Sequence, residues 1–343
     1  MRIRITLSAD RSGVIVFNYQ HQIQAIIYGF LSRSNPDYAQ WLHQQGFIYK
    51  KDKRFKLFVF SGIIFDGPIK IIRLNNTNHS NNVANQYNME ESPRLAKEGD
   101  RGWSKSLGIT LGVKQPPNSL TISTGFSFKA SQTHPFTFSF QIASPVDKFI
   151  QHLIDGIFRE GNEITLGRQK ITIYRIETLP DPVAFNSEIQ NPKSEILLKP
   201  LESPIFIKKP MPPGRQDIFL FPGDEGYAEF LNQNLLHKYE TLHGKLFGGE
   251  PLKFDFHTIN GKSVKQFTIF KKGSDGSKKP VNIKGTLQPF TVTGAEELIR
   301  IGLECGFGQN NSMGCGYVEM NRDGQDRQDK FVETQYLASL KQR

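Results

Sequence analysis

The chain has 343 residues, which is more than a single core usually holds and fits two domains of similar size. Its 43 Lys and Arg residues outnumber its 33 Asp and Glu residues, and the net charge of +10 suits an anionic partner such as nucleic acid as well as it suits plain solubility. Two cysteines in a chain of this length exclude a disulfide framework, and no apolar run approaches the roughly 20 residues of a membrane span. Composition therefore predicts a cytoplasmic protein without a membrane partner.

The first half of the chain predicts strands and helices in alternation. Apolar and polar residues alternate over residues 1–8, as they do in a strand. Apolar residues at helical spacing predict a helix over 18–32, and Asn35-Pro36 is typical of the N-cap and first turn of a second helix that ends at Gly46. Further strands are expected at 56–61, 69–74, about 120–123, 136–142, 163–166 and 170–176, with a helix capped by Ser144 whose apolar stripe runs from Val146 to Phe158.

Two segments interrupt this pattern. Residues 75–106 are rich in asparagine and charge and hold few residues that could form a core, so we expect a long, exposed and mobile insertion. The proline-containing stretch 177–195 is expected to be a linker. The predicted organisation is therefore an N-terminal domain over 1–180, a C-terminal domain over 195–321 and a polar tail over 322–343.

The second half repeats the order of elements found in the first. Strands are expected at 196–201, 205–208, on both sides of the tip 273–276, before Thr293 and at 317–320, with helices at 227–242 and 298–303. Thr293 and Glu296 have the spacing of a capping box. Each half thus has approximately β-α-β-β-α-β order, which predicts an α+β protein made of two tandem ferredoxin-like domains.

Three polar residue types in the first half could carry chemistry. Tyr28 lies on the same side of its helix as His21 and Gln24, His43 lies off the apolar stripe of the second helix, and a basic run at 49–56 follows. A histidine, a tyrosine and a lysine close together can cleave RNA without a metal, because the RNA supplies the 2′-OH nucleophile and the protein need only move protons and balance charge. Each type also has a common structural use, as a surface histidine, a packing tyrosine or a solvated lysine.

No other arrangement in the sequence competes with this one. There is no Cys and His spacing typical of a zinc site, no cluster of carboxylates for two metal ions, and no phosphate-binding motif of the P-loop kind. We therefore expect neither a metal nor a cofactor.

A glycine-rich segment near the C-terminus, residues 306–316, stands out because glycines alternate with other residues around a polar centre. Glycine permits positive φ and a close approach of main-chain N–H groups to a ligand, and successive exposed N–H groups form a nest for phosphate oxygens. In a competing interpretation, Gly314 and Gly316 only permit close packing of this loop against a sheet.

Residues 306–318 closely resemble the C-terminal glycine-rich signature of the CRISPR-associated endoribonucleases that process precursor CRISPR RNA, within the repeat-associated mysterious protein (RAMP) superfamily. Residues 18–28, 38–43 and 55–61 are similar to that family too. The resemblance implies tandem ferredoxin-like domains and a metal-independent cut within each CRISPR repeat that leaves a 5′-hydroxyl and a 2′,3′-cyclic phosphate or 3′-phosphate. It places a catalytic triad at Tyr28, His43 and Lys56.

The resemblance also implies where RNA binds. In the family the glycine loop of the second domain belongs to the RNA-binding apparatus, and near Lys56 the basic run offers other cations that could reach the phosphate. The residues expected to bind CRISPR repeat RNA are Lys50, Lys51, Lys53, Arg54, Gly306, Gly308, Gln309, Asn310, Asn311, Ser312, Gly314 and Gly316. A homodimer and a place in a CRISPR effector complex stay open.

Two other functions compete with the nuclease. One is a non-catalytic RNA-binding subunit of an effector complex, which would have no need of His43. The other is a general RNA-binding module unrelated to CRISPR, which would bind RNA with strong salt dependence and little sequence preference. The presence of His43 favours the enzyme.

Overall fold

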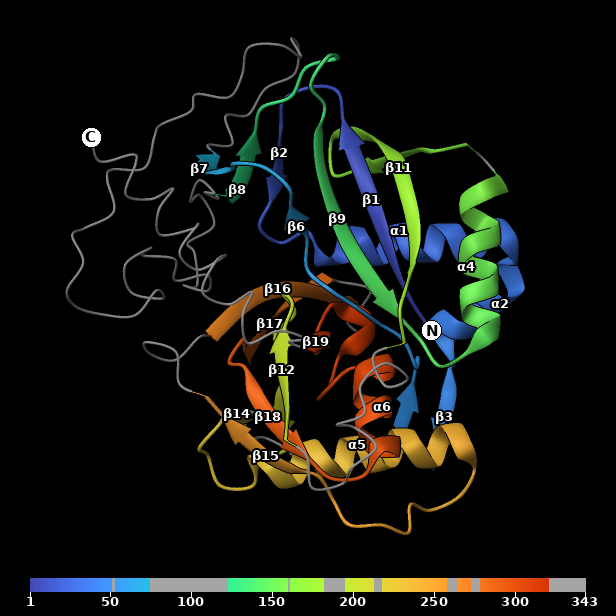
Figure 1. Ribbon diagram of the computed structural model, residues 1–343, viewed down its shortest axis with the longest axis vertical. Helices are drawn as coiled ribbons and strands as arrows, with labels where there is room; N and C mark the ends of the chain where they lie inside the picture. The colour runs from blue at the N-terminus through green and yellow to red at the C-terminus, as the bar shows by residue number, and fades with distance from the viewer. Residues whose placement is uncertain are drawn as a thin grey trace, which may run out of the picture.

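The computed structural model describes residues 1–50, 53–74, 123–159, 161–181, 195–212, 218–257, 264–272 and 278–320. The predicted insertion at 75–106, most of the predicted linker, the tip 273–276 and the tail 322–343 lie outside the described residues. The predicted limits of the two domains stay a prediction. In Figure 1 the two largest sheets lie one above the other, each with helices against it.

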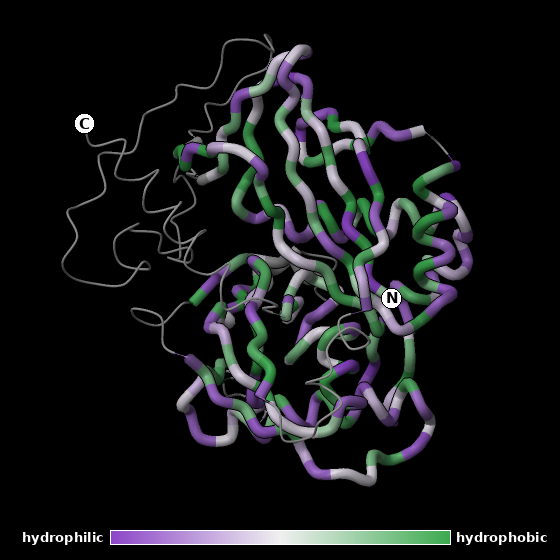
Figure 2. Tube along the Cα trace, in the orientation of Figure 1, coloured by the Kyte–Doolittle hydropathy of each residue, from purple (hydrophilic) through white to green (hydrophobic). Residues whose placement is uncertain are grey.

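The first sheet is built around β1 (Arg2–Ala9). Its strands lie in the order β10 (Glu163–Leu166), β11 (Gln169–Leu179), β1, β9 (Phe136–Ala143) and β5 (Val59–Phe60), with β6 (Ile64–Phe65) also paired to β9, and all pairs are antiparallel. Taken in chain order, β1, β5, β9 and β11 have the 4-1-3-2 arrangement of a ferredoxin-like sheet. Apolar and polar residues alternate along these strands (Figure 2), so that Ile3 and Ile5 lie in the core.

Helices α1 (Gln20–Ser34) and α4 (Asp147–Arg159) pack on the apolar face of this sheet, and α1 runs behind it in Figure 1. Helix α2 (Pro36–Gln44) follows α1 directly. The Asn35 side chain accepts a hydrogen bond from Tyr38 N at 2.9 Å, which confirms the predicted N-cap and the proline in the first turn. A small sheet of β2 (Gly13–Val16), β8 (Ser123–Phe128) and β7 (Lys70–Leu74) completes the described part of this half.

The second sheet has the same topology as the first. Its order is β15 (Lys253–Phe256), β18 (Phe290–Thr293), β12 (Ile196–Pro200) and β19 (Val318–Met320), which again corresponds to 4-1-3-2 read from the β19 edge. Helices α5 (Tyr227–His243) and α6 (Glu296–Cys305) connect its strands and pack into one core with it. Two hairpins are added, β13 (Ile207–Lys209) with β14 (Ile218–Leu220), and β16 (Val264–Lys272) with β17 (Lys278–Thr286). The tandem ferredoxin-like α+β fold predicted from the sequence is confirmed.

Three local predictions are wrong. The expected strand at 56–61 is broken, because β4 (Lys53–Phe55) pairs with β3 (Phe47–Tyr49) and the chain then turns through Leu57 with φ 52° before β5. Thr293 ends β18 and caps nothing; α6 begins at Glu296 after Ala295, which makes no side-chain cap. Phe158 is 72 % exposed because Ile157, at 3 %, takes the last buried position of α4.

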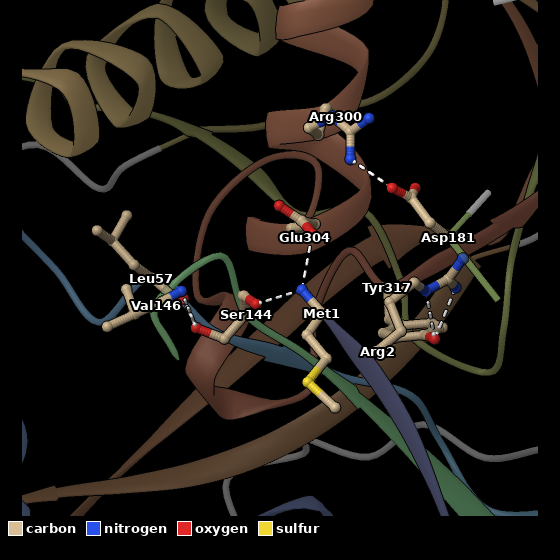
Figure 3. Close-up of polar contacts among 9 residues, drawn as sticks. All are labelled: Met1, Arg2, Leu57, Ser144, Val146, Asp181, Arg300, Glu304 and Tyr317. Carbon is tan, nitrogen blue, oxygen red and sulfur yellow. Dashed lines mark hydrogen bonds and ion pairs between the residues drawn. The ribbon is translucent and has the colours of Figure 1, made fainter. Parts of the chain in front are cut away.

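Buried polar contacts join the two halves. Arg2 Nη2 donates to Tyr317 Oη at 2.6 Å (Figure 3). It also donates to Val318 O at 3.0 Å, and Tyr317 Oη donates to Gln141 Oε1 at 2.6 Å. Leu57, from the first half, lies in the core of the second. A buried network in which every member has a partner fixes one geometry, so the two sheets meet in a defined orientation. Within the described residues, no helix has the length and apolar character needed to cross a membrane.

Candidate active site

Tyr28 and His43 meet where α1 and α2 lie side by side. Their ring centroids are 5.1 Å apart at an interplanar angle of 83°. Tyr28 is half-buried and its ring also packs edge-on against Phe58, at 6.1 Å. His43 is exposed in the last turn of α2. An accessible imidazole therefore lies directly beside a phenol whose orientation is fixed by packing.

Lys56 reaches the same place from the segment between β4 and β5. Its Nζ donates to the main-chain oxygen of Leu42 and, at 2.7 Å, to that of His43. A lysine bound to the last carbonyls of a helix satisfies acceptors that have no partner within the helix and also faces the negative end of its dipole. Lys56 thus holds the end of α2 that carries His43, and the structure brings the three predicted catalytic residues together.

Burial sets the protonation of two of the three groups. Burial, and after it the Tyr38 hydroxyl, raises the pKa of the Tyr28 phenol far above its ordinary value, so the phenol is neutral at pH 7. Burial, and after it the charge of Arg54, lowers the pKa of Lys56 to about 8. The Lys56 ammonium is therefore charged at pH 7 but loses its proton well within the alkaline range.

The basic run forms the hairpin of β3 and β4, which packs on α5 of the second half. The Tyr49 ring stacks on His237 with centroids 4.2 Å apart, and Lys53 Nζ lies 2.8 Å from His237 Nδ1. Burial, and after it the charge of Lys53, lowers the pKa of His237 to about 4, so the imidazole is neutral and accepts from the Lys53 ammonium. Lys53 therefore has a structural partner, in addition to the RNA-binding role expected of it.

The other members of the run differ in exposure. Lys50 is exposed and its Nζ lies 4.9 Å from the centroid of the Tyr49 ring. Arg54 is exposed and donates to Gln44 O at 3.2 Å, beside the end of α2. Lys51 lies outside the described residues. Two exposed cations therefore lie close in sequence to Lys56, on the hairpin that precedes it.

The glycine loop, residues 306–316, is largely an interior structure. The N–H groups of Phe307, Gln309 and Gly316 donate to main-chain oxygens of the protein at 2.9, 2.8 and 3.0 Å. Gly316 has φ +80°, and a Cβ there would lie 1.9 Å from Phe307 O. The prediction of an exposed nest of N–H groups is wrong for these positions, because the fold itself uses the donors. Close packing, the competing interpretation, accounts for Gly314 and Gly316.

Side chains also hold the loop from within. Lys238 of α5 is completely buried, and its Nζ donates to Gly306 O at 2.6 Å and to Gly308 O at 2.9 Å. Burial lowers the pKa of Lys238 to about 7. Asn311 is buried and its Nδ2 donates to Phe307 O and Cys315 O. Of the loop residues expected to bind RNA, the half-buried ones are Gln309, Asn310 and Ser312.

Sequence reasoning missed Lys238, although it left a signal. Leu231, Leu235 and Lys238 share one helical stripe, and a lysine at a core position of such a stripe needs a buried partner. The partners are main-chain oxygens of a loop far away in the sequence, and no pattern in the sequence identifies them. No pattern in the sequence pointed to the contact between His237 and Lys53.

The described residues contain no group of three or more His, Cys, Asp and Glu side chains that could hold a metal ion.

Comparison with known proteins finds similar chains. Residues 186–320 match the family model described as CRISPR associated protein Cas6, C-terminal. A curated protein of Methanocaldococcus jannaschii named CRISPR-associated endoribonuclease Cas6 1 is 25 % identical over 97 % of this chain and 98 % of its own length. The CRISPR-associated endoribonuclease Cas6 of Pyrococcus furiosus is 21 % identical over 91 % of this chain and 85 % of its own. A solved structure of a Cas6-related protein from Pyrococcus furiosus has a TM-score of 0.60 at 18 % identity, covering 94 % of this chain and 99 % of the other.

The structure has two ferredoxin-like sheets, and the glycine loop contacts a helix of each half through Gln24 and Lys238. The resemblance inferred from the sequence is confirmed: the chain is similar over nearly its whole length to proteins named CRISPR-associated endoribonuclease, and residues 186–320 match the Cas6 C-terminal family model.

Proposed function

We propose that this protein is a metal-independent endoribonuclease that binds CRISPR repeat RNA and cleaves precursor CRISPR RNA within each repeat. The observation that carries the proposal is the meeting of the Tyr28 phenol, the His43 imidazole and the Lys56 ammonium at the end of α2. The names of the curated relatives support the reaction class. The same relatives support a CRISPR RNA as the substrate.

The proposed reaction needs one proton acceptor and one proton donor. The 2′-oxygen of the RNA attacks the adjacent phosphorus as its proton leaves, the bond from phosphorus to the 5′-oxygen breaks, and that oxygen gains a proton. The products are a 2′,3′-cyclic phosphate and a 5′-hydroxyl. His43 is the better acceptor because an imidazole takes a proton at neutral pH. Tyr28 is the donor, because burial keeps its phenol protonated.

Lys56 has two parts in this proposal. It fixes the main chain of His43, and its charge stabilises the negative charge that develops on the phosphate oxygens. An ammonium group has three N–H donors, of which the carbonyls of Leu42 and His43 take two. The third can face a phosphate. Lys50 and Arg54 are proposed to bind the neighbouring phosphates. The half-buried loop residues Gln309, Asn310 and Ser312 are proposed to bind another part of the RNA.

The domain limits, 1–180 and 195–321, belong to the same proposal, as do a homodimer and association with a CRISPR effector complex. The competing function is a non-catalytic RNA-binding subunit of such a complex. It predicts tight binding of repeat RNA without a cut.

The experiment that decides between them is cleavage of the source organism's CRISPR repeat RNA in EDTA by the wild type and by His43→Ala. We expect a single cut with a 5′-hydroxyl product, slowed by roughly 10²-fold or more in the variant, with binding retained. His134→Ala is the matched control, since His134 is exposed in a turn of the first half. Binding without cleavage by the wild type supports the non-catalytic subunit, and equal cleavage by His43→Ala removes His43 from the mechanism.

A further inference from the structure

One side of α1 is polar although it faces the interior. Gln20, Gln24 and Tyr28 follow one another at intervals of four residues and so lie along one side of the helix. Gln20 is 1 % exposed, and neither its Oε1 nor its Nε2 has a hydrogen-bond partner among the described residues. A buried amide is rarely left unpaired without a reason in function or in strain. The reason has to be sought in what this side of α1 touches.

It touches the glycine loop. Gln24 Nε2 donates to Ser312 O at 2.7 Å, between residues 288 positions apart in the chain. Gly314, with φ +87°, lies so close to the first turn of α1 that a Cβ there would be 3.1 Å from Gln20 Cγ. The short helix η1 (Asn311–Met313) of the loop is therefore pressed against the end of α1 that leads to Tyr28.

The opposite side of the loop is fixed by the second half of the protein. Lys238 binds the oxygens of Gly306 and Gly308, and Asn311 binds those of Phe307 and Cys315. The loop is thus a rigid body attached to α5. Its hydrogen bond to Gln24 lies one helical turn, about 6 Å of helix rise, from Tyr28.

We propose that Gln24 is a positioning residue for RNA cleavage: its hydrogen bond to Ser312 O fastens the glycine loop to α1, and so aligns RNA held by the second half with Tyr28. This inference rests on the proposed nuclease function. It assigns to Gln24 no contact with RNA and no proton transfer. Removing the hydrogen bond leaves the binding residues and the catalytic groups in place. Without it, the position of the glycine loop relative to Tyr28 is no longer fixed.

A structural role alone would give a different result. If Gln24 served only to stabilise the fold, its loss would lower the melting temperature and leave the cleavage rate of the folded protein unchanged. A positioning residue instead changes the rate of the chemical step at saturating enzyme more than it changes the affinity for RNA. The two roles are separated by the size of the rate change relative to the change in Kd.

The test uses the full-length protein and three variants. Gln24→Met keeps the length of the side chain and removes the donor, Gln24→Lys restores a donor that can reach Ser312 O, and Gln22→Met is the matched control on the same helix. Single-turnover cleavage of CRISPR repeat RNA is measured in EDTA at saturating enzyme. Affinity is measured with the same RNA carrying a 2′-deoxyribose at the position where the wild type cuts.

We expect Gln24→Met to cleave roughly five- to tenfold more slowly, as the loss of one hydrogen bond allows, while its Kd changes less than about twofold. We expect Gln24→Lys to recover most of the rate and Gln22→Met to match the wild type. The inference is overturned if Gln24→Met cleaves at the wild-type rate, if Gln22→Met is slowed equally, or if Gln24→Lys is no faster than Gln24→Met. If the wild type itself does not cut, the proposed function has failed, and the wild-type reaction alone shows this.

Discussion

The proposed catalytic cluster and the glycine loop differ in the kind of group that forms each of them. In the cluster of Tyr28, His43 and Lys56, side chains from three segments converge at an accessible helix end. In the loop, main-chain groups and glycines are packed inside, and at Gly308 and Gly316 an added Cβ would meet a backbone oxygen. Substitutions in the cluster should therefore lower the activity more than the stability. Substitutions in the loop should lower the stability more than the activity, because the loop residues act through close packing.

The largest effect on stability is expected from Gly316→Ala. The position has φ +80° and a Cβ would lie 1.9 Å from Phe307 O, so the new methyl group adds a clash with backbone to an unfavourable φ. We expect a loss of about 4 kcal/mol or more in the free energy of unfolding, or failure to fold.

Gly161→Ala is the matched control for this substitution. Gly161 has φ +70°, but nothing lies within 4 Å of an added Cβ, so only the cost of φ remains, about 1 kcal/mol. Urea unfolding of both variants measures the difference. Equal losses would contradict the view that the loop is defined by close packing.

A smaller and purely functional effect is expected from Lys56→Arg. Burial lowers the pKa of Lys56 to about 8, so in the wild type the charged fraction falls as the pH rises above 8. If the charge is needed for cleavage, the rate should decline by about tenfold per pH unit beyond that point. Arginine keeps its charge throughout this range, so the decline should disappear in the variant.

The pH dependence of single-turnover cleavage between pH 6 and pH 10 measures this prediction. Lys53→Arg is the control and should leave the decline in place, because Lys53 is bound to His237 and makes no contact with the carbonyl of His43 among the described residues. A wild-type rate that stays constant up to pH 10 would show that the charge of Lys56 is not required.

The same contrast explains what the sequence could and could not show. Helices α1 and α2, the N-cap of α2 at Asn35 and the strand with Ile3 and Ile5 on one face depend on local spacing, and the structure contains all of them. The burial of the glycine loop depends on which distant carbonyls its N–H groups reach, such as Phe206 O for Gln309. The spacing of residues along the chain does not identify these distant carbonyls.

The catalytic cluster lies between these cases. Helical spacing singled out Tyr28 and His43 as polar residues of their helices, but their grouping with Lys56 into one triad came from the resemblance to a family. The loop at Leu57 that lets Lys56 turn back onto α2 was predicted as part of a continuous strand. The positive φ at a leucine has no local signature, because the contacts that hold Leu57, in the core of the second half and with Ser144, come from distant parts of the chain.

The smallest effect is expected where a cation of the basic hairpin is exposed. Lys50→Ala should weaken binding of repeat RNA by roughly threefold at moderate salt and lower the dependence of log K on log salt by about one unit, as the loss of one phosphate contact does. Lys170→Ala, an exposed lysine on β11, is the control and should change neither value. Binding isotherms at several salt concentrations measure both. If Lys50→Ala and Lys170→Ala behave alike, the hairpin does not contact RNA through Lys50, and the path of the RNA has to be sought nearer to Arg54 and the end of α2.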